Sequence, residues 1–218
     1  MLFRDRCDAG QKLAERLAFL KDEKDVIVLG IPRGGVVVAA EVARGLRAPL
    51  DVFIAHKIGA PFNPELAIGA ITRNGHVLLD DEMLGAMDLS EQEIAREIAY
   101  QRAEMARRVE MFQRERAPLD VKNKIVIVID DGIATGATML VALRALTQQA
   151  LARLILAVPV APADSFARLA RECDDAIALA TPSPFWAVGR FYAQFEQTSD
   201  AEVIALLDDA ARRGASSQ

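Results

Sequence analysis

The segment that most constrains the fold is an uninterrupted apolar run, residues 125–129, that is followed by two adjacent aspartates. A short strand that is apolar on both faces is typical of the centre of a parallel sheet, which helices cover on both sides. Small and hydroxyl side chains follow at residues 134–138 and lead into a helix that is expected to end near residue 149. This order predicts an α/β protein whose ligand site lies at the carboxyl ends of its strands.

Strands and helices alternate along most of the chain. Short apolar runs predict strands at residues 26–29, 50–58, 125–129, 154–158 and 176–180. Further helices are predicted at about residues 8–21, 36–46, 162–171 and 199–212. Such alternation implies right-handed crossovers, and therefore a parallel sheet flanked by helices.

The middle of the chain carries different signals. Two apolar runs within residues 67–79 flank the pair Asn74-Gly75, which is a strong hairpin signal. Ser90 and Glu93 form a capping box at the start of a long charged helix, expected at residues 90–116. We therefore predict an inserted hairpin and long helix.

Composition limits the class of protein and its location. The 218 residues are 52% apolar, which suits one domain with a sizeable core, and the net charge of −5 argues against a nucleic-acid or membrane surface. Cys7 and Cys173 are too few for a disulfide framework, suit a reducing compartment and are each interpreted as a small buried or half-buried hydrophobe. The first ten residues resemble no secretory signal, and no apolar run approaches the roughly 20 residues of a membrane helix. The expected location is the cytoplasm.

The acidic pair and the loop after it suggest the chemistry of the ligand. Asp130 and Asp131 end a buried strand, where adjacent carboxylates are unfavourable unless a cation or hydroxyl donors face them. In the following loop, backbone N–H groups at a helix start and the hydroxyls of Thr135 and Thr138 could bind an anion. A sugar phosphate would satisfy both features. The alternative is an ordinary turn with solvated aspartates.

Another glycine loop, residues 30–35, is the first of the two along the chain and follows the first predicted strand of the sheet. Arg33 could bind a phosphate in bidentate fashion, and Gly34 and Gly35 would allow its close approach. The alternative is an ordinary turn between a strand and a helix, with Arg33 on the surface.

The thirteen residues 126–138 resemble the 5-phosphoribosyl-1-pyrophosphate signature of the type I phosphoribosyltransferases. The motif lacks the Gly-Lys-Ser/Thr of a Walker A loop, and its one departure from the family pattern is Gly132, where a larger aliphatic residue is usual. The resemblance implies that Asp130 and Asp131 hold the ribose hydroxyls as catalytic residues. It also implies a 5′-phosphate site formed by Ala134, Thr135, Gly136, Ala137 and Thr138.

The same resemblance assigns the first glycine loop to pyrophosphate. The expected contacts are Pro32, Arg33, Gly34 and Gly35, with Arg33 also catalytic, and with a cis peptide bond at Pro32–Arg33 or its neighbour. The implied cofactor is magnesium (Mg2+), bound through pyrophosphate and ribose oxygens. Direct ligation of the metal by Asp130 and Asp131 is an open alternative.

Residues 56–69 correspond to a mobile loop that closes over the active site in this family. We expect residues 57–66 to form this lid, with Lys57 as a catalytic contact of pyrophosphate or, alternatively, a solvated side chain. Glu65 could orient a metal-bound water or cap a local turn, and His56 is interpreted as structural. This segment and the hairpin after it resemble a bacterial subgroup of phosphoribosyltransferases that is named from sequence only.

Residues 181–198 correspond to the hood that binds the base. Trp186 or Phe185 could stack on a nucleobase, with a core or interface role as the alternative. The other aromatic residues of the segment are interpreted as packing: Phe191, Tyr192 and Phe195. In enzymes acting on 6-oxopurines an aspartate occupies the position of Ala134, so a hypoxanthine or guanine substrate is disfavoured.

The resemblance implies one phosphoribosyltransferase domain over residues 1–218. Its core is expected at about residues 22–180, its inserted hairpin and long helix at 67–117 and its hood at 181–198. The expected reaction is a magnesium-dependent transfer of the 5-phosphoribosyl group to a nitrogen nucleophile such as a nucleobase, in nucleotide metabolism and in a homodimer. The alternative is a regulatory module that binds the donor without transferring it. The acceptor base is not specified by the sequence.

Overall fold

The computed structural model describes residues 2–72, 77–79, 84–85, 87, 89–113 and 118–215. The chain divides into two compact units. Unit 1 comprises residues 1–53 and 117–218, and unit 2 comprises residues 54–116.

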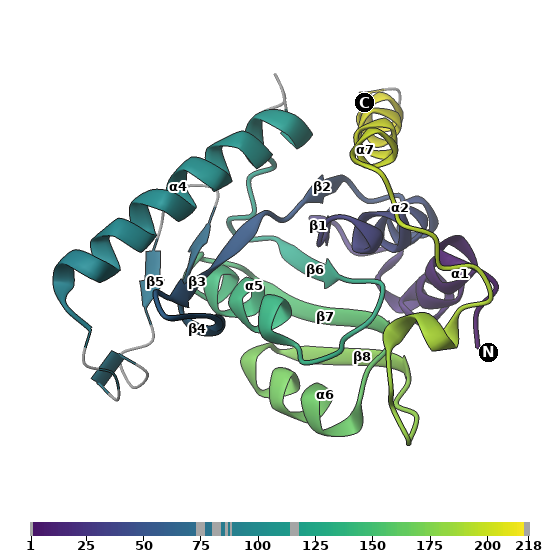
Figure 1. The fold of residues 1–218 in the computed structure, drawn as a ribbon. Helices are drawn as coiled ribbons and strands as arrows, with labels where there is room; N and C mark the ends of the chain where they lie inside the picture. The colour runs from purple at the N-terminus through teal and green to yellow at the C-terminus, as the bar shows by residue number, and fades with distance from the viewer. Residues whose placement is uncertain are drawn as a thin grey trace. The chain divides into compact units, whose positions relative to one another are not determined.

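Unit 1 contains a five-stranded sheet in the order β2-β1-β6-β7-β8, in which every neighbouring pair is parallel (Figure 1). Its strands are β1 (Val26–Gly30), β2 (Leu50–Val52), β6 (Ile125–Ile129), β7 (Arg153–Val160) and β8 (Asp175–Ala180). Central β6 is almost entirely buried, as a strand covered on both faces should be. The predicted parallel α/β sheet is confirmed.

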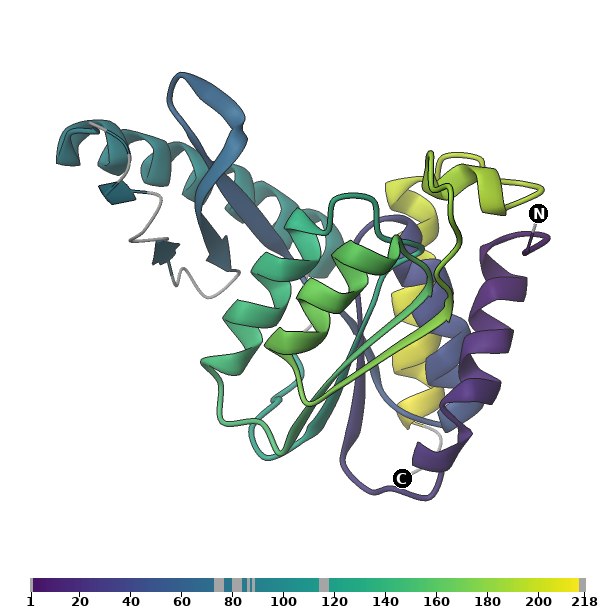
Figure 2. The ribbon, with the colours of Figure 1, turned by 90° about the horizontal axis from the view of Figure 1, so that it is seen from below.

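Helices cover both faces of this sheet. They are α1 (Arg6–Arg16), α2 (Gly34–Leu46), α5 (Ala137–Thr147), α6 (Ala163–Leu169) and α7 (Asp200–Ala215), with short 3-10 turns at Ala18–Leu20, Ala170–Glu172 and Val188–Phe191. In Figure 2, α5 and α6 lie on one face of the sheet, and α1, α2 and α7 lie on the other.

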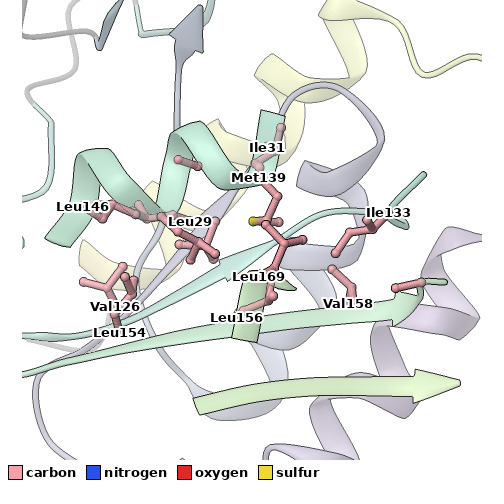
Figure 3. Close-up of a cluster of buried hydrophobic side chains, with 14 of the residues drawn as sticks. Leu29, Ile31, Val126, Ile133, Met139, Leu146, Leu154, Leu156, Val158 and Leu169 are labelled. Atoms are coloured by element: carbon pink, nitrogen blue, oxygen red, sulfur yellow. The ribbon is translucent and has the colours of Figure 1, made fainter. Parts of the chain in front are cut away.

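The core beneath α5 fixes the position of the loop that precedes this helix. Met139 and Leu146 of α5 point toward Val126, Leu154 and Leu156 of the sheet, and all five are buried (Figure 3). Burying side chains of this size stabilises the fold by about 1.5–3 kcal/mol each. The start of α5 is therefore held at the carboxyl end of β6.

Unit 2 contains an antiparallel sheet, β3 (Ala55–Ala60), β4 (Asn63–Thr72) and β5 (Val77–Leu79), and the long helix α4 (Glu91–Gln113), which packs on β3 and β4. The pairing of β4 with β5 confirms the predicted hairpin, although its turn, residues 73–76, lies outside the described residues. The capping box is also confirmed, because Ser90 N donates to Glu93 Oε2 (2.9 Å) and Glu93 N to Ser90 Oγ (3.3 Å).

Two predictions in this region are wrong. Residues 50–58 do not form one strand, because β2 belongs to the sheet of unit 1 and β3 to that of unit 2. Residues 57–66 do not form an irregular loop, because β3 and β4 pair as a hairpin around a turn at residues 61–62, while closure of this segment over a ligand stays a prediction. Pro61 lies in this turn, where its fixed φ is favourable, so its presence did not indicate a longer loop.

In the part of the chain that the structure describes, no helix has both the length and the apolar character required to cross a membrane.

Candidate functional site

The two glycine-containing loops lie side by side because they follow neighbouring strands. Parallel β1 and β6 pair from Val26↔Ile125 to Gly30↔Ile129, and Ile31 N continues the ladder by donating to Ile129 O (2.8 Å). The predicted cis peptide bond is present at Pro32–Arg33. The carboxyl ends of the two strands therefore bring both predicted phosphate loops to one edge of the sheet.

The first loop packs directly against the acidic pair. A Cβ atom at Gly34 would lie 1.9 Å from Asp131 Oδ2, and a Cβ atom at Gly35 would lie 2.8 Å from the Cα atom of Asp130. Glycine at these two positions is therefore required by close packing.

Each aspartate uses one carboxylate oxygen within the protein. Asp130 Oδ1 accepts a hydrogen bond from Asp131 N (2.8 Å), and Asp131 Oδ2 accepts one from Arg6 Nε (2.7 Å). Within the described residues, Asp130 Oδ2 and Asp131 Oδ1 have no donor, and both side chains are only partly exposed. Two carboxylate oxygens are thus left to accept hydrogen bonds from a ligand.

The electrostatics of the pair favour a ligand that supplies positive charge or hydrogen-bond donors. Burial raises the pKa of Asp130 well above its ordinary value, and the charge of Asp131 raises it further, whereas Arg6 lowers it. Burial also raises the pKa of Asp131, and the guanidinium group of Arg6 opposes this shift. Because ionisation of both carboxylates is unfavourable here, hydroxyl groups or a cation placed opposite them would stabilise the ionised pair.

The second loop forms the start of α5. Gly136, at the N-cap position, has a φ of 80°, in the left-handed region that favours glycine. From α6, Ser165 Oγ donates to Ala134 O (3.2 Å) and Arg168 Nη2 donates to Thr135 O (2.6 Å). These side chains hold the loop through its carbonyl groups, while the N–H groups at a helix start have no partner within the helix.

The remaining predicted residues of this loop are Ala134, Thr135, Ala137 and Thr138, and all four are exposed to solvent. The Thr135 hydroxyl accepts a long hydrogen bond from Ala137 N (3.4 Å). An anion could therefore approach the helix start without displacing a large side chain.

Arg33 projects from the first loop toward the start of α7. Its Nη1 atom lies 3.7 Å from Asp200 Oδ1, and the two side chains are 39% and 41% exposed. An ion pair this exposed contributes little stability, so Arg33 could exchange Asp200 for a phosphate group.

The predicted hood residues have different environments. Phe185 contacts Phe191, with ring centroids 5.0 Å apart, and packs in an apolar cluster, whereas Trp186 is 75% exposed. Packing is confirmed for the aromatic rings of Tyr192 and Phe195, whose centroids are 4.9 Å apart. Phe185 is therefore engaged in packing, whereas the Trp186 side chain is open to solvent.

The unusual Gly132 is explained by the same segment. A Cβ atom at this position would lie 2.4 Å from Val188 Cγ1 and 3.1 Å from Val160 Cγ1. Val188 therefore fills the space in which a larger aliphatic residue would place its side chain.

Two contacts of the acidic pair were missed by the sequence analysis. Arg6 binds the Asp131 side chain, and Tyr192 Oη donates to the Asp131 carbonyl oxygen (2.5 Å). Burial raises the pKa of Tyr192, so its hydroxyl group remains a donor across the ordinary pH range. Arg6 lies 125 residues from its partner, a separation at which local sequence patterns carry no signal.

Lys57, Glu65 and His56 belong to unit 2. Lys57 and His56 lie in β3 and Glu65 lies in β4. Their side chains lie outside what the structure describes, so the roles expected for them stay predictions.

The neighbouring strands β1 and β6 thus bring an acidic pair and two glycine-containing loops to the carboxyl edge of a parallel sheet, the edge at which α/β proteins of this class bind their ligands. The phosphoribosyl transferase domain family matches residues 4–190. The chain therefore belongs to this family.

Relatives agree with this membership. Two Mycobacterium tuberculosis proteins, MT0597 and Rv0571c, are each 47% identical over 211 residues and are named provisionally as phosphoribosyl transferases. The match covers 97% of this chain and 47% of each relative, so the chain spans about half of their length. The crystal structure of TT1426 from Thermus thermophilus is 42% identical, with a TM-score of 0.88 over 96% of this chain and 99% of that one.

Proposed function

We propose that this chain transfers the 5-phosphoribosyl group of 5-phosphoribosyl-1-pyrophosphate to a nitrogen nucleophile, with magnesium as cofactor. The C1′–oxygen bond of the donor breaks, and pyrophosphate leaves with the bonding electron pair. The nitrogen lone pair forms the new C1′–N bond, and the proton on this nitrogen passes to solvent water. Because charge develops on the ribose ring and on pyrophosphate, positioning and electrostatic stabilisation are the main tasks of the protein.

The observation that carries this proposal is the packing of the acidic pair between the two loops. Asp130 and Asp131 each have a carboxylate oxygen without a donor among the described residues, and Gly34 lies so close to Asp131 that a Cβ atom there would be 1.9 Å from Oδ2. A ligand with two hydroxyl groups between two phosphate groups matches this order of acceptors and anion sites. Phosphoribosyl pyrophosphate has that order.

The residues divide by the part of the donor that they would bind. Asp130 and Asp131 would accept hydrogen bonds from the ribose hydroxyls. The 5′-phosphate would lie against Ala134, Thr135, Gly136, Ala137 and Thr138. Pyrophosphate would lie against Pro32, Arg33, Gly34 and Gly35, with Lys57 as a further catalytic contact from unit 2.

The donor set suits magnesium held largely by the substrate. Magnesium prefers oxygen ligands and is usually bound by one or two carboxylates together with substrate phosphates and water. Asp130 and Asp131 supply two carboxylates, and no group of three or more His, Cys, Asp or Glu side chains that could hold a metal is found among the described residues. When bound, magnesium would neutralise charge that develops on the leaving pyrophosphate.

Trp186 is the better candidate for stacking on the acceptor base. Phe185 is already packed against Phe191, while Trp186 is 75% exposed and so accessible to a planar ligand. Ala134 argues against a 6-oxopurine acceptor, and we propose another nucleobase. We further propose that the chain forms a homodimer, acts in nucleotide metabolism and is located in the cytoplasm. The unpaired Cys7 and Cys173 suit a reducing compartment of this kind.

Two measurements test the proposal. Titration calorimetry with the donor should give saturable binding that strengthens with magnesium. Exchange of labelled pyrophosphate into the donor should then depend on one member of a panel of nucleobases. Failure to bind the donor would refute the proposed function, whereas tight binding without exchange for any base would support the regulatory alternative.

A further inference from the structure

Arg6 is a charged residue of unit 1 that the proposed roles leave unused. It is the first residue of α1, a helix whose N-cap is Asp5, with the Asp5 side chain accepting a hydrogen bond from Asp8 N (2.7 Å). Its Nε atom donates to Asp131 Oδ2 (2.7 Å), and the two side chains are only 12% and 16% exposed. This ion pair is therefore largely removed from solvent, unlike the exposed Arg33–Asp200 pair.

The Arg6 guanidinium group is held on two further sides by the segment that follows β8. Nη1 donates to the carbonyl oxygen of Glu196 (2.7 Å), and the guanidinium carbon lies 3.9 Å from the centroid of the Phe195 ring. The Phe195 ring stacks in turn on Tyr192, whose hydroxyl group donates to Asp131 O. A planar group fixed by a carboxylate, a carbonyl and a ring has little freedom to rotate.

The backbone before Arg6 is anchored to the same segment. Phe3 N donates to Phe191 O (3.0 Å), Ala193 N donates to Phe3 O (2.9 Å) and Gln194 N donates to Arg4 O (2.8 Å). Figures 1 and 2 both show the amino-terminal stretch running beside the yellow-green segment after β8. The amino terminus is thus hydrogen-bonded to the segment after β8, and Arg6 extends from there to the acidic pair.

We propose that Arg6 is a positioning residue for the ribose-binding acid Asp131. Arg6 occupies Oδ2, fixes the plane of the carboxylate and leaves Oδ1 facing the ligand, so that the carboxylate is oriented before the donor arrives. Preorganising an acceptor in this way avoids the loss of side-chain freedom on binding. The inference rests on the proposed function, because it assumes that Asp131 binds the ribose of the donor.

The rival explanation is that Arg6 only attaches the amino terminus to the segment around Phe195. Both explanations predict that Arg6→Gln lowers stability, so stability does not separate them. They differ in how Arg6 and Asp131 depend on each other. A positioning residue loses its effect on donor binding once the carboxylate that it positions has been removed, whereas a purely structural residue does not.

The test is a double-mutant cycle with Arg6→Gln and Asp131→Asn, read out by the Kd of 5-phosphoribosyl-1-pyrophosphate with magnesium and by kcat. Removing the partner that orients a ligand-binding group commonly costs about 10- to 100-fold in affinity or activity. In the parent background we therefore expect Arg6→Gln to weaken donor binding and to lower kcat by a factor in this range. In the Asp131→Asn background we expect a loss of less than about twofold. Equal losses in the two backgrounds would overturn the proposal.

Two further variants control the experiment. Arg4→Gln removes an arginine of the same segment whose side chain is 67% exposed and pairs with Asp5, and it should leave donor binding and kcat unchanged. Arg6→Lys retains the positive charge, so the proposal can still be tested if Arg6→Gln does not fold. The lysine variant should fold and still lose turnover, because lysine does not reproduce the planar fork.

The controls also separate this inference from the proposed function. A lysine variant with the Kd and kcat of the parent would show that Arg6 supplies only charge, and would overturn the positioning role. A parent protein that does not bind the donor would instead refute the proposed function itself.

Discussion

At the residue scale, Gly34 and Arg6 leave no room for a further atom beside the Oδ2 oxygen of Asp131. A Cβ atom at Gly34 would lie 1.9 Å from Asp131 Oδ2 and 2.6 Å from Arg6 Nε. One added methyl group would therefore have to displace the carboxylate or the arginine that binds it. In the proposed function the donor-binding geometry depends on both groups, so Gly34 would be constrained by the site as well as by its own loop.

Gly34→Ala is expected to fold, to weaken donor binding and to lower turnover by about 10²-fold, the usual cost of displacing reacting groups by about 1 Å. Titration calorimetry measures the Kd, and urea unfolding measures the stability. The matched control is Gly214→Ala in α7, where a Cβ atom would meet nothing within 4 Å. The control should bind normally and gain up to about 1 kcal/mol in free energy of unfolding. Normal binding by Gly34→Ala would contradict this prediction.

Asp130→Asn should make the protein more stable and less able to bind the donor. Because burial raises the pKa of Asp130, the folded state holds its proton more tightly than the unfolded state does. The contribution of Asp130 to the free energy of unfolding is therefore largest below its ordinary pKa of 3.8 and is lost as the pH rises through the raised pKa. Asparagine does not ionise, so the variant avoids this loss.

The measurement is the difference in Tm between Asp130→Asn and the parent across pH. The difference should be positive at pH values above the raised pKa and should shrink toward the ordinary pKa of 3.8. Asp22→Asn, at an exposed aspartate, serves as the control and should give no such trend. A variant less stable than the parent at neutral pH would show that Asp130 is structural rather than functional.

Some residues of the site could be predicted from the sequence, and others could not. Asp130, Asp131 and the glycines lie in two short continuous motifs. Their proximity follows from the neighbouring parallel strands β1 and β6 that precede these motifs. Arg6 lies in no motif, and nothing in the sequence distinguishes it from Arg4 two residues earlier. Only the folded chain reveals which of these two arginines is exposed and which one faces Asp131.

At the element scale, the start of α5 is a loop supported from outside by α6. Ser165 and Arg168 bind the carbonyl groups of the loop, and Leu169 packs beneath Gly136. The loop geometry is therefore set by helix packing before any anion binds. A bulky side chain in the loop would meet α6 on one side and the expected phosphate on the other.

Gly136→Val should abolish binding of the donor. Residue 136 has a φ of 80°, and its Cβ atom would lie 2.9 Å from Leu169 Cδ1, so valine is both strained and crowded there. Binding of inorganic phosphate and of the donor would be followed by calorimetry, with circular dichroism to verify folding. Gly85→Val, at a position with nothing within 4 Å of the added Cβ atom, is the control. Parent-like phosphate binding by Gly136→Val would show that the 5′-phosphate site lies elsewhere.

Elements of unit 1 were predicted better than those around the boundary of unit 2. In unit 1, β1, β6 and β7 are each a compact apolar run followed by a helix, so local pattern and tertiary structure agree. Residues 50–58 also form an apolar run, but the run does not reveal that the chain leaves one sheet at Val52 and enters another at Ala55. Which sheet a strand joins depends on pairing with residues distant in the sequence, as β2 pairs with β1 through Val28↔Leu50.

At the scale of the whole molecule, unit 2 is inserted between two points of unit 1 that are close together. Leu119 N donates to Asp51 Oδ2 (3.2 Å), so the chain leaves and re-enters unit 1 at neighbouring positions. All five strands of the parallel sheet, the acidic pair and both glycine loops belong to unit 1. The expected donor site therefore has most of its parts without unit 2, with Lys57 as the exception.

Replacing residues 54–116 by a flexible linker tests whether unit 1 binds the donor without unit 2. A Gly/Ser linker of about six residues is long enough to join ends this close. We expect the shortened chain to unfold cooperatively and to bind the donor with magnesium, because its sheet and both phosphate loops are retained. We expect its turnover to fall by about 10²-fold, the usual cost of losing one group that stabilises developing charge.

Lys57→Ala in the full-length chain identifies the group responsible. If Lys57 contacts pyrophosphate chiefly as negative charge develops there, its removal should lower kcat more than it weakens binding of the donor. The shortened chain and Lys57→Ala should then lose similar amounts of turnover, since both lack the same ammonium group. A Lys57→Ala enzyme with parent kcat, beside an inactive shortened chain, would assign the catalytic contribution of unit 2 to another residue. A shortened chain with parent turnover would show that unit 1 alone carries the reaction.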